Sequence, residues 1–514
     1  SLSPLYYYNT RLLFDWFCLQ FLFLNNKNII KSQQTTTPQI EMNTSNNNIN
    51  SGDSSWVLSS GALAFFMTFG LVLYYAGGSI NKTSIMYTMV CTLSVIPVIA
   101  LQWYLFGYSL TYSEEGGSFI GNLKYAFLQH ITLDSEPHAI APTIPAMTFC
   151  YFELTFAIIT PALVLSGVVE RMKVGYFMIF MFVWATLVYD VIAHWAWSPH
   201  GWFYVWGGDD TAGGMPIETA SGFSALAVAL ALGPRKKPAS GLANAPMFLI
   251  GGAILLYGWI GFNAASIYNT NNRSANAAYV TIFTGAVASA TWMLCEYIQH
   301  KKFHIESIIN GAVAGMVCIT PAAGYIMPHY SLVFGVVCGF ACWGMSKLRV
   351  RFVDDSLDTF AVHGVGGFLG LVLTGVFAEK EIIAYDTPIN NGGAVDGFGM
   401  QILYQLAGAS AAAGWSFVVT YVIVLVMKDI ARLCKSDIVH QDQDNLDQLV
   451  CGEGEAHTDV NQVQQQGEGE MLVNTRVSLP NSEQSEPRNS VNLKRISLPA
   501  IEHPKTEPAL SQLK

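Results

Sequence analysis

The sequence predicts an all-α membrane protein that crosses the bilayer eleven times, as two inverted five-helix repeats followed by a final helix. Three observations support this fold class. Of 514 residues, 52% are hydrophobic and only 12% are charged, about half the charged fraction of a soluble domain. Apolar runs of spanning length recur between residues 56 and 427. One motif also occurs twice, at residues 209–226 and 354–371.

The predicted spans are apolar runs close to the roughly 20 residues that a helix needs to cross a bilayer. Several contain Gly or Pro, such as Pro97, Pro161 and Pro321, which neighbouring helices tolerate in a membrane. The predicted transmembrane domain covers residues 56–428. Its eleven spans are residues 56–78, 86–112, 145–169, 174–197, 217–233, 245–267, 277–298, 307–327, 330–347, 358–378 and 401–427.

Residues 1–55 are predicted to be a polar, irregular N-terminal extension. Its apolar run from Leu12 to Leu24 is interrupted by Asp15 and is too short for a spanning helix of roughly 20 residues. No small-residue cleavage site follows it. The first methionine is Met42, and we expect the natural protein to start there; the alternative is a weak signal segment.

The cysteines and the net charge exclude several classes of protein. The nine cysteines are scattered, with neither a paired framework nor the spacing of metal ligands, so we expect packing residues and no metal or cofactor. Six of them fall inside apolar runs: Cys91, Cys150, Cys295, Cys318, Cys338 and Cys342. The net charge of −10 arises largely in the C-terminal tail, so it carries no information about nucleic acid; we expect no nucleic-acid partner.

The cationic residues of the short loops predict the orientation. With eleven spans, most of these residues fall on one face, which the positive-inside rule makes cytoplasmic. The N-terminus is therefore predicted to be external or lumenal and the C-terminus cytoplasmic. The cytoplasmic group is Lys82, Arg171, Lys173, Arg235, Lys236, Lys237, Lys301, Lys302, Lys347, Arg349, Arg351, Lys428, Arg432 and Lys435, against Lys124, Arg273 and Lys380 on the other face.

The repeated motif places one titratable residue near the start of spans five and ten. An acid pair precedes Glu218 in DDTAGGMPIETASGFSAL and precedes His363 in DDSLDTFAVHGVGGFLGL. Five spans separate the copies, so the second enters the membrane from the opposite side, and a substrate site is expected near the midplane. A titratable group inside a span is a functional hypothesis by default. The alternatives are a chance resemblance of two Gly-rich helices or a buried salt bridge that stabilises the fold.

At these residues the sequence resembles the ammonium transporter family, Amt/Mep, with the Rhesus proteins as distant relatives. The resemblance covers about residues 56–435 and includes ERMK after the third span, AHWAW, DTAGG, GWIGFNAAS and DDSLDTFAVHG, in that order. Family members carry two pore histidines. This chain keeps the second as His363 and has Glu218 at the first, as some fungal members do. The resemblance also implies a homotrimer with one pore per subunit.

The resemblance implies an outer recruitment site and a gate. Trp197, Phe156 and Ser266 match the recruitment site, where an aromatic face holds a cation with about 0.5–2 kcal/mol. Phe152, Phe156 and Phe262 match the gating region. Without the motifs, Trp197 would be read as an interfacial anchor and the phenylalanines as core residues.

Carboxylates near these residues are expected to have supporting roles. Asp210 matches a family acid, which we expect to cap the fifth span and to favour a cation below the recruitment site; a cap alone is the alternative. Asp358 is interpreted as its counterpart and as a cap at the tenth span. Glu153, beside Phe152, is a further carboxylate that could join a proton route.

The expected substrate dictates a mechanism. Ammonium is a potassium-sized cation, so a selective path must use hydrogen bonding or remove the proton. Moving an intact ion through an apolar core has a Born cost on the order of 20 kcal/mol, which neutral ammonia avoids. We therefore expect recruitment of ammonium, or its analogue methylammonium, deprotonation, and conduction of ammonia past Glu218 and His363. The two form a coupled pair, either carboxylate with imidazolium or neutral acid with neutral imidazole.

Residues 429–514 are predicted to be a cytoplasmic, largely disordered regulatory tail, because they are acidic, Gln/Ser-rich and lack an apolar period. Residues 445–457 resemble a regulatory segment of the family, but depart from it at Asn445, Cys451 and His457. RVSLP and KRISLP place Ser478 and Ser497 two residues after an arginine, a pattern that suggests phosphorylation by a kinase.

Two other functions remain open beside the transporter. One is an ammonium sensor that signals through the tail, and the other is an electroneutral gas channel of the Rhesus type. An enzyme is not expected, because the sequence contains no recognisable nucleophile, cofactor loop or metal cluster. The lipid bilayer in question is the plasma membrane or an endolysosomal or vacuolar-type membrane.

Overall fold

The computed structural model describes residues 48–79, 82–235, 241–349, 353–355, 357–385, 391–440 and 445–452. The chain divides into two units, Ser1–Cys451 and Gly452–Lys514, and all helices described below belong to the first. Within the described ranges the secondary structure is helical, apart from one isolated antiparallel bridge between Met172 and Val439.

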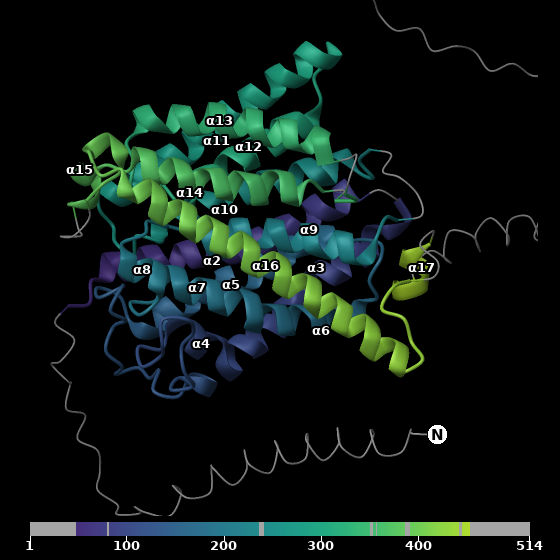
Figure 1. Cartoon of the computed structure of the whole chain (residues 1–514), viewed down its shortest axis with the longest axis horizontal. Helices are drawn as coiled ribbons and strands as arrows, with labels where there is room; N and C mark the ends of the chain where they lie inside the picture. Colours follow the sequence, from purple (N-terminus) through teal and green to yellow (C-terminus); the bar gives the residue numbers. More distant parts are fainter. Residues whose placement is uncertain are drawn as a thin grey trace, which may run out of the picture. The chain divides into compact units, whose positions relative to one another are not determined.

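The first five membrane-crossing segments correspond to the predicted first repeat, and their helices carry the purple to teal colours in Figure 1. The first helix begins at Ser51, within the predicted extension, because the side chain of Asn50 accepts the Gly52 and Asp53 N–H groups and caps it. Three of the five segments contain a π-helical stretch, which often marks functional sites. The segments are α2 (Ser51–Gly78); α3 (Ile85–Gln102), η2 (Trp103–Gly107) and α4 (Tyr108–Tyr112); α5 (Ala146–Val164) and η4 (Leu165–Gly167); α6 (Val174–Trp184), η5 (Ala185–Tyr189) and α7 (Asp190–Trp197); and η6 (Gly214–Thr219) and α9 (Ala220–Leu232).

The next five segments form the second repeat, and one long helix follows. The second repeat consists of α10 (Ala245–Ala265), α11 (Asn272–His300), α12 (Ile305–Ile319), α13 (Pro328–Arg349), and η7 (Phe360–Gly364) with α14 (Val365–Phe377); the last crossing is α16 (Met400–Leu433). The short elements are η1 (Lys82–Ser84), η3 (Ala126–Leu128), α8 (Trp202–Trp206), α15 (Lys380–Ile383), η8 (Ala394–Asp396) and α17 (Leu446–Cys451). Both fifth segments start with a π-helical turn, as expected for equivalent elements of two repeats.

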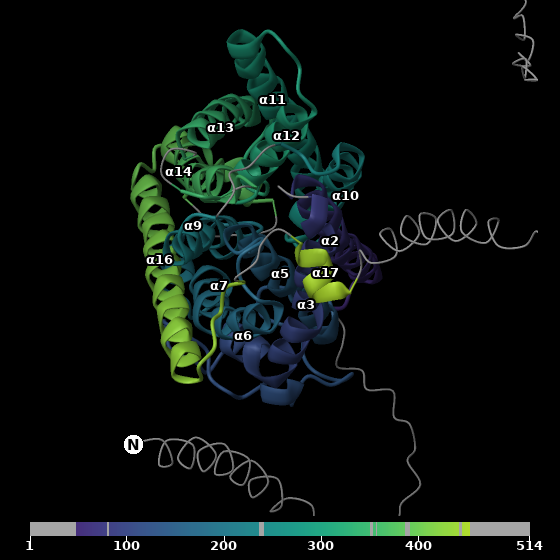
Figure 2. The same ribbon diagram turned by 90° about the vertical axis from the view of Figure 1, so that its right-hand side faces the viewer.

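Reciprocal packing joins the two repeats. The first helix of each repeat, α2 and α10, packs along the other, while α9 contacts η7 and α14 contacts η6. Helix α16 crosses both α9 and α14 (Figures 1 and 2). Helix α5 is buried on nearly all sides, whereas α11 and α16 expose apolar faces, as lipid contact requires. The two π-helical turns are therefore held together inside the bundle.

The described residues contain ten helices long and apolar enough to cross a membrane, together with the shorter apolar helix α12. Each of the eleven predicted spans falls on one of these helices. The C-terminal boundary of predicted span 307–327 was wrong, because α12 ends at Ile319 and Pro321 follows it. Proline cannot supply the backbone N–H that would continue a helix, and the chain turns there instead.

The cysteines require a second correction. Cys318 of α12 and Cys338 of α13 form a disulfide, with Cα atoms 6.4 Å apart, where the sequence predicted packing residues only. The two cysteines become neighbours because α12 and α13 pack side by side. Spacing along the chain does not reveal such a contact.

Candidate functional site

The two titratable residues of the repeated motif are in direct contact. Glu218 lies in η6 and His363 in η7, and His363 Nδ1 is 2.7 Å from Glu218 Oε2. Both side chains are buried, and the His363 ring lies nearly parallel to the Trp259 ring, with centroids 6.3 Å apart. The other carboxylate oxygen, Glu218 Oε1, is buried without a hydrogen-bond partner among the described residues. The pair thus leaves one polar atom free to meet a small ligand.

Glycines allow the two π-helical turns to approach. A Cβ added at Gly367 would lie 2.5 Å from Glu218 Cβ and 2.9 Å from Thr219 N. A Cβ added at Gly222 would collide with the backbone of Gly364. Small residues thus bring the backbones close enough for Glu218 and His363 to touch.

The pair lies in a narrow, mostly apolar cavity, which we call the conduit. Its volume is about 10 Å³, close to the minimum that a single water molecule needs. The apolar lining residues outnumber the polar ones, so a charged ligand would find few partners. The conduit is lined by Met67, Leu71, Tyr74, Ile159, Leu163, Ile217, Glu218, Leu255, Trp259, Phe262, Val313 and His363.

A larger cavity lies on the face predicted to be external, and we call it the outer vestibule. Its volume is about 330 Å³, and Trp197, Asp210 and Ser266 line it together with Tyr268 and Arg273. The Trp197 indole N–H donates to the Asp210 carbonyl over 3.1 Å. The Ser266 hydroxyl donates to the Phe262 carbonyl over 2.8 Å, so its oxygen can still accept a hydrogen bond.

Aromatic rings separate the vestibule from the conduit. The ring of Phe156 lies 6.1 Å from Trp197, 4.9 Å from Phe152 and 4.3 Å from Phe262, centroid to centroid. Phe262 also lines the conduit. Phe156 therefore contacts both other phenylalanines predicted to form a gate, and it links Trp197 of the vestibule to Phe262 of the conduit.

Asp210 caps the fifth segment. Its carboxylate accepts the N–H groups of Gly213, Gly214 and Met215 over 2.7–2.9 Å. Burial raises the pKa of Asp210 to about 6, although these backbone hydrogen bonds oppose the shift. The side chain therefore combines a structural role with a charge that titrates just below neutrality.

The equivalent cap in the second repeat is Asp355, where the sequence interpretation chose Asp358. Asp355 follows Asp210 by the same 145 positions that separate Glu218 from His363, and its Oδ2 accepts the Phe360 N–H over 2.8 Å. Asp358 instead has a left-handed backbone, with φ of 60°. It lines a separate cavity on the opposite face of the protein.

This second cavity, the inner cavity, has a volume of about 260 Å³. The Tyr74 hydroxyl, which lines the conduit, donates to Asn310 Oδ1 in the inner cavity over 2.6 Å. This hydrogen bond lies between the two spaces. Sequence reasoning missed both residues, although Asn310 is a lone amide in an apolar run and could have been noticed. The inner cavity is lined by Trp292, Glu296, His300, His304, Glu306, Ser307, Asn310, Ser346, Lys347 and Asp358.

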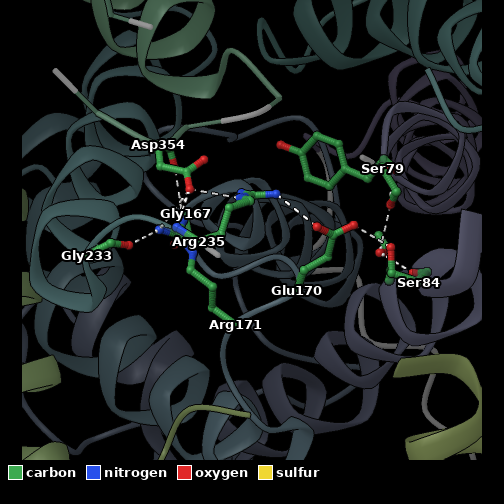
Figure 3. A network of polar contacts seen from close by, with 10 residues as sticks. Ser79, Ser84, Gly167, Glu170, Arg171, Gly233, Arg235 and Asp354 are labelled. Carbon is green, nitrogen blue, oxygen red and sulfur yellow. Dashed lines mark hydrogen bonds and ion pairs between the residues drawn. The ribbon is translucent and has the colours of Figure 1, made fainter. Parts of the chain in front are cut away.

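The ERMK turn forms a buried polar network on the face predicted to be cytoplasmic (Figure 3). Arg235 Nη1 lies 3.1 Å from Glu170 Oε2, and Arg235 Nε lies 2.9 Å from Asp354 Oδ2. The Arg171 guanidinium donates to the backbone carbonyls of Gly167, Gly233 and Asp354.

This network joins both repeats and supports the C-terminal segment. Glu170 accepts a hydrogen bond from the Ser84 hydroxyl, which directly precedes α3 at the start of the second span. Burial and then the neighbouring Arg235 lower the pKa of Arg171 to about 10. The His440 N–H donates to the Arg171 carbonyl over 2.8 Å. The segment after α16 is therefore attached directly to the ERMK turn.

Several predicted features fall outside the described residues, including the expected start at Met42. Ser478 and Ser497, the candidate phosphorylation sites, lie beyond residue 452, and the regulatory segment is described only over residues 445–452. In that part, the Asp447 carboxylate accepts the Tyr87 N–H over 2.8 Å.

A helical bundle with a vestibule on each side of a buried titratable pair has the architecture of a membrane channel or transporter. The sequence profile of the Ammonium Transporter Family matches residues 55–452. The chain belongs to this family.

Individual relatives agree with this assignment. Ammonium transporter 1 of Schizosaccharomyces pombe is 36% identical over 410 residues, which cover 79% of this chain and 82% of the relative. Ammonium transporter MEP2 of Saccharomyces cerevisiae is 34% identical over 393 residues, which cover 74% of this chain and 78% of the relative. The crystal structure of Candida albicans Mep2 is similar, with a TM-score of 0.72 at 35% identity, covering 77% of this chain and 88% of that chain.

Proposed function

We propose that the protein transports ammonium nitrogen across a membrane, by recruiting NH4+ in the outer vestibule, removing a proton and conducting NH3 through the conduit. The contact between Glu218 and His363 inside a narrow apolar cavity carries this proposal. The family assignment supports ammonium as the substrate. The proposed role is therefore transport rather than catalysis of a covalent reaction.

Recruitment would use three groups of the vestibule. The face of Trp197 can attract a cation, and the Ser266 oxygen can accept an N–H hydrogen bond. The Asp210 carboxylate adds negative charge beneath them, although its oxygens are already occupied by backbone donors. We expect Phe152, Phe156 and Phe262 to act as a gate by moving apart as the ligand passes.

Removal of the proton explains how the conduit could select its ligand. A hydrated cation does not fit in about 10 Å³, and stripping an ion of its water has a Born cost on the order of 20 kcal/mol. Ammonia carries no charge and needs only a few polar partners. Potassium has no proton to lose, so the same barrier would exclude it.

The Glu218 and His363 pair would then receive the neutral ligand. The free Glu218 Oε1 can accept a hydrogen bond from NH3, and a proton can move between the two side chains along their 2.7 Å hydrogen bond. Because the pair is coupled, its protons belong to both residues. Its function is therefore to pass ammonia, while the proton that ammonium loses either follows through this pair or returns to the water of the outer vestibule.

The remaining features of the proposal concern assembly and regulation. We infer a homotrimer in a plasma membrane or an endolysosomal or vacuolar-type membrane, with an external or lumenal N-terminus and a cytoplasmic C-terminus. Asp358 would then face the cytoplasm. A kinase acting on Ser478 or Ser497 would regulate the tail. Attachment of the C-terminal segment to the ERMK turn favours one further candidate, an ammonium sensor that signals through this segment.

Transport by the purified protein tests these functions together. In proteoliposomes, uptake of methylammonium with an accompanying current supports net charge transfer. Uptake without current supports a Rhesus-type gas channel, and ammonium binding with neither supports a sensor. The proposed function fails if wild-type protein, correctly inserted, takes up neither ammonium nor methylammonium.

A further inference from the structure

The outer vestibule has no net formal charge from its own lining. Its two charged lining residues are Asp210 and Arg273, which have opposite signs. Asp210 is buried and accepts three backbone N–H groups, so part of its potential is already compensated. A cavity that concentrates a cation needs an excess of negative potential. A further acid close to the vestibule would supply it.

Glu153 of α5 is an acid in the right place. It is 2% exposed, and its two oxygens accept the hydroxyls of Tyr112 and Tyr268, the latter over 2.7 Å. Within the described ranges, it forms no ion pair. Tyr268 also lines the outer vestibule. One tyrosine ring therefore connects the buried carboxyl group to the space where the cation would be recruited.

The backbone holds Tyr268 in an unusual conformation. Its φ is 58°, a left-handed value that is rare for a bulky residue. Its N–H donates to the Ala265 carbonyl over 2.9 Å, and its ring packs on Phe149 and Phe152 at centroid distances of 5.4 and 6.1 Å. Such conformations persist where the surroundings over-determine them. The ring is thus fixed between Glu153 and the gate.

We propose that Glu153 is a positioning residue of the ammonium recruitment site, acting through the Tyr268 hydroxyl. That hydroxyl donates a hydrogen bond to the Glu153 carboxylate, which leaves its oxygen lone pairs as acceptors for an N–H of ammonium. Donation to a charged acceptor polarises the phenol and strengthens its accepting side. When ionised, the Glu153 carboxylate also supplies negative potential to the vestibule, where the charge of Arg273 offsets that of Asp210. This inference rests on the proposed function and names a further determinant of its first step.

The proposal differs from a purely structural role for the carboxyl group. Asp190 offers the matched comparison, since it is also a fully buried carboxylate of the first repeat. Its oxygens accept from Gln102 and Thr111, and it lines none of the three cavities described above. A buried acid that serves packing alone should behave like Asp190.

The test measures methylammonium uptake by full-length protein in proteoliposomes. The variants are Glu153→Gln, Tyr268→Phe, the double variant, and Asp190→Asn as the control. Glu153→Gln and Tyr268→Phe should each raise KM about tenfold, the factor expected when a charge-assisted hydrogen bond is lost, with little change in the maximal rate. The double variant should show no further increase, because both changes remove the same interaction. Asp190→Asn should leave KM unchanged.

Three results would overturn the proposal: an unchanged KM in Tyr268→Phe, an unchanged KM in a folded Glu153→Gln protein, or effects of the two single variants that multiply in the double variant. Tyr268→Phe removes only a hydroxyl from a partly exposed ring, so it remains informative if Glu153→Gln does not fold. Stabilisation of the purified proteins by methylammonium, measured from the unfolding temperature, gives a readout independent of transport. If wild-type protein did not transport, the proposed function would fail, whereas a tenfold lower apparent affinity for methylammonium in this stabilisation assay, shared by Glu153→Gln and Tyr268→Phe, would still support the role of Glu153.

Discussion

Replacing Gly367 with alanine should disconnect the titratable pair. The new Cβ would lie 2.5 Å from Glu218 Cβ, whereas ordinary contacts begin at 3.4 Å, so α14 and η6 must separate by about 0.9 Å. If that movement is transmitted to the 2.7 Å contact between His363 and Glu218, the contact exceeds the roughly 3.5 Å limit of a hydrogen bond. We expect methylammonium uptake to fall at least tenfold, while overpacking lowers stability by about 1–3 kcal/mol.

The assay compares uptake per inserted protein for wild type, Gly367→Ala and Gly344→Ala. Gly344 lies in α13, where an added Cβ meets nothing within 4 Å, so its replacement should leave transport unchanged. The unfolding temperature in detergent separates loss of folding from loss of transport. Wild-type uptake by a folded Gly367→Ala protein would refute the argument that glycine brings the two side chains together.

Other variants test the site and its support. His363→Leu should abolish methylammonium uptake without reducing membrane insertion, and normal uptake would remove His363 from the pathway. Glu218→His should stay active with a shifted pH profile; an unchanged profile would argue against Glu218 in proton transfer. Because burial raises the pKa of Asp210 to about 6, its charge is lost as the pH falls through 6, so wild-type uptake should decline there and the Asp210→Asn profile should lack this step. Arg235→Ala removes the cation of a buried ion-pair network and should lower the free energy of unfolding by about 3–5 kcal/mol, which a lower unfolding temperature would reveal. Arg432→Ala removes one partner of an exposed ion pair and should leave the unfolding temperature unchanged.

The sequence predicted the central contact because the repeat carries three-dimensional information. Two copies entering the membrane from opposite sides place equivalent residues near one point, and Glu218 and His363 are such equivalent residues. The membrane spans could also be predicted from the sequence, because the length of an apolar run is a property of the chain itself. The ends of the spans were harder to predict. Pro321 follows the early end of α12, although proline is tolerated inside α3 and α5.

Features that depend on packing could not be predicted. The disulfide between Cys318 and Cys338 arises from two helices lying side by side. The choice between Asp355 and Asp358 as the cap depends on which carboxylate reaches a backbone N–H, and both are close to the helix start. Tyr268 lies in a loop without a motif, so only the folded chain shows its hydrogen bond to Glu153.

The central claim is that the conduit passes a deprotonated ligand past the Glu218 and His363 pair. The most direct test gives proteoliposomes containing wild-type protein equal inward gradients of ammonium and of potassium, and records uptake and current at several external pH values. We predict saturable ammonium uptake that His363→Leu abolishes, and no potassium uptake under any condition. Potassium flux comparable to ammonium flux through the wild-type protein would contradict the account.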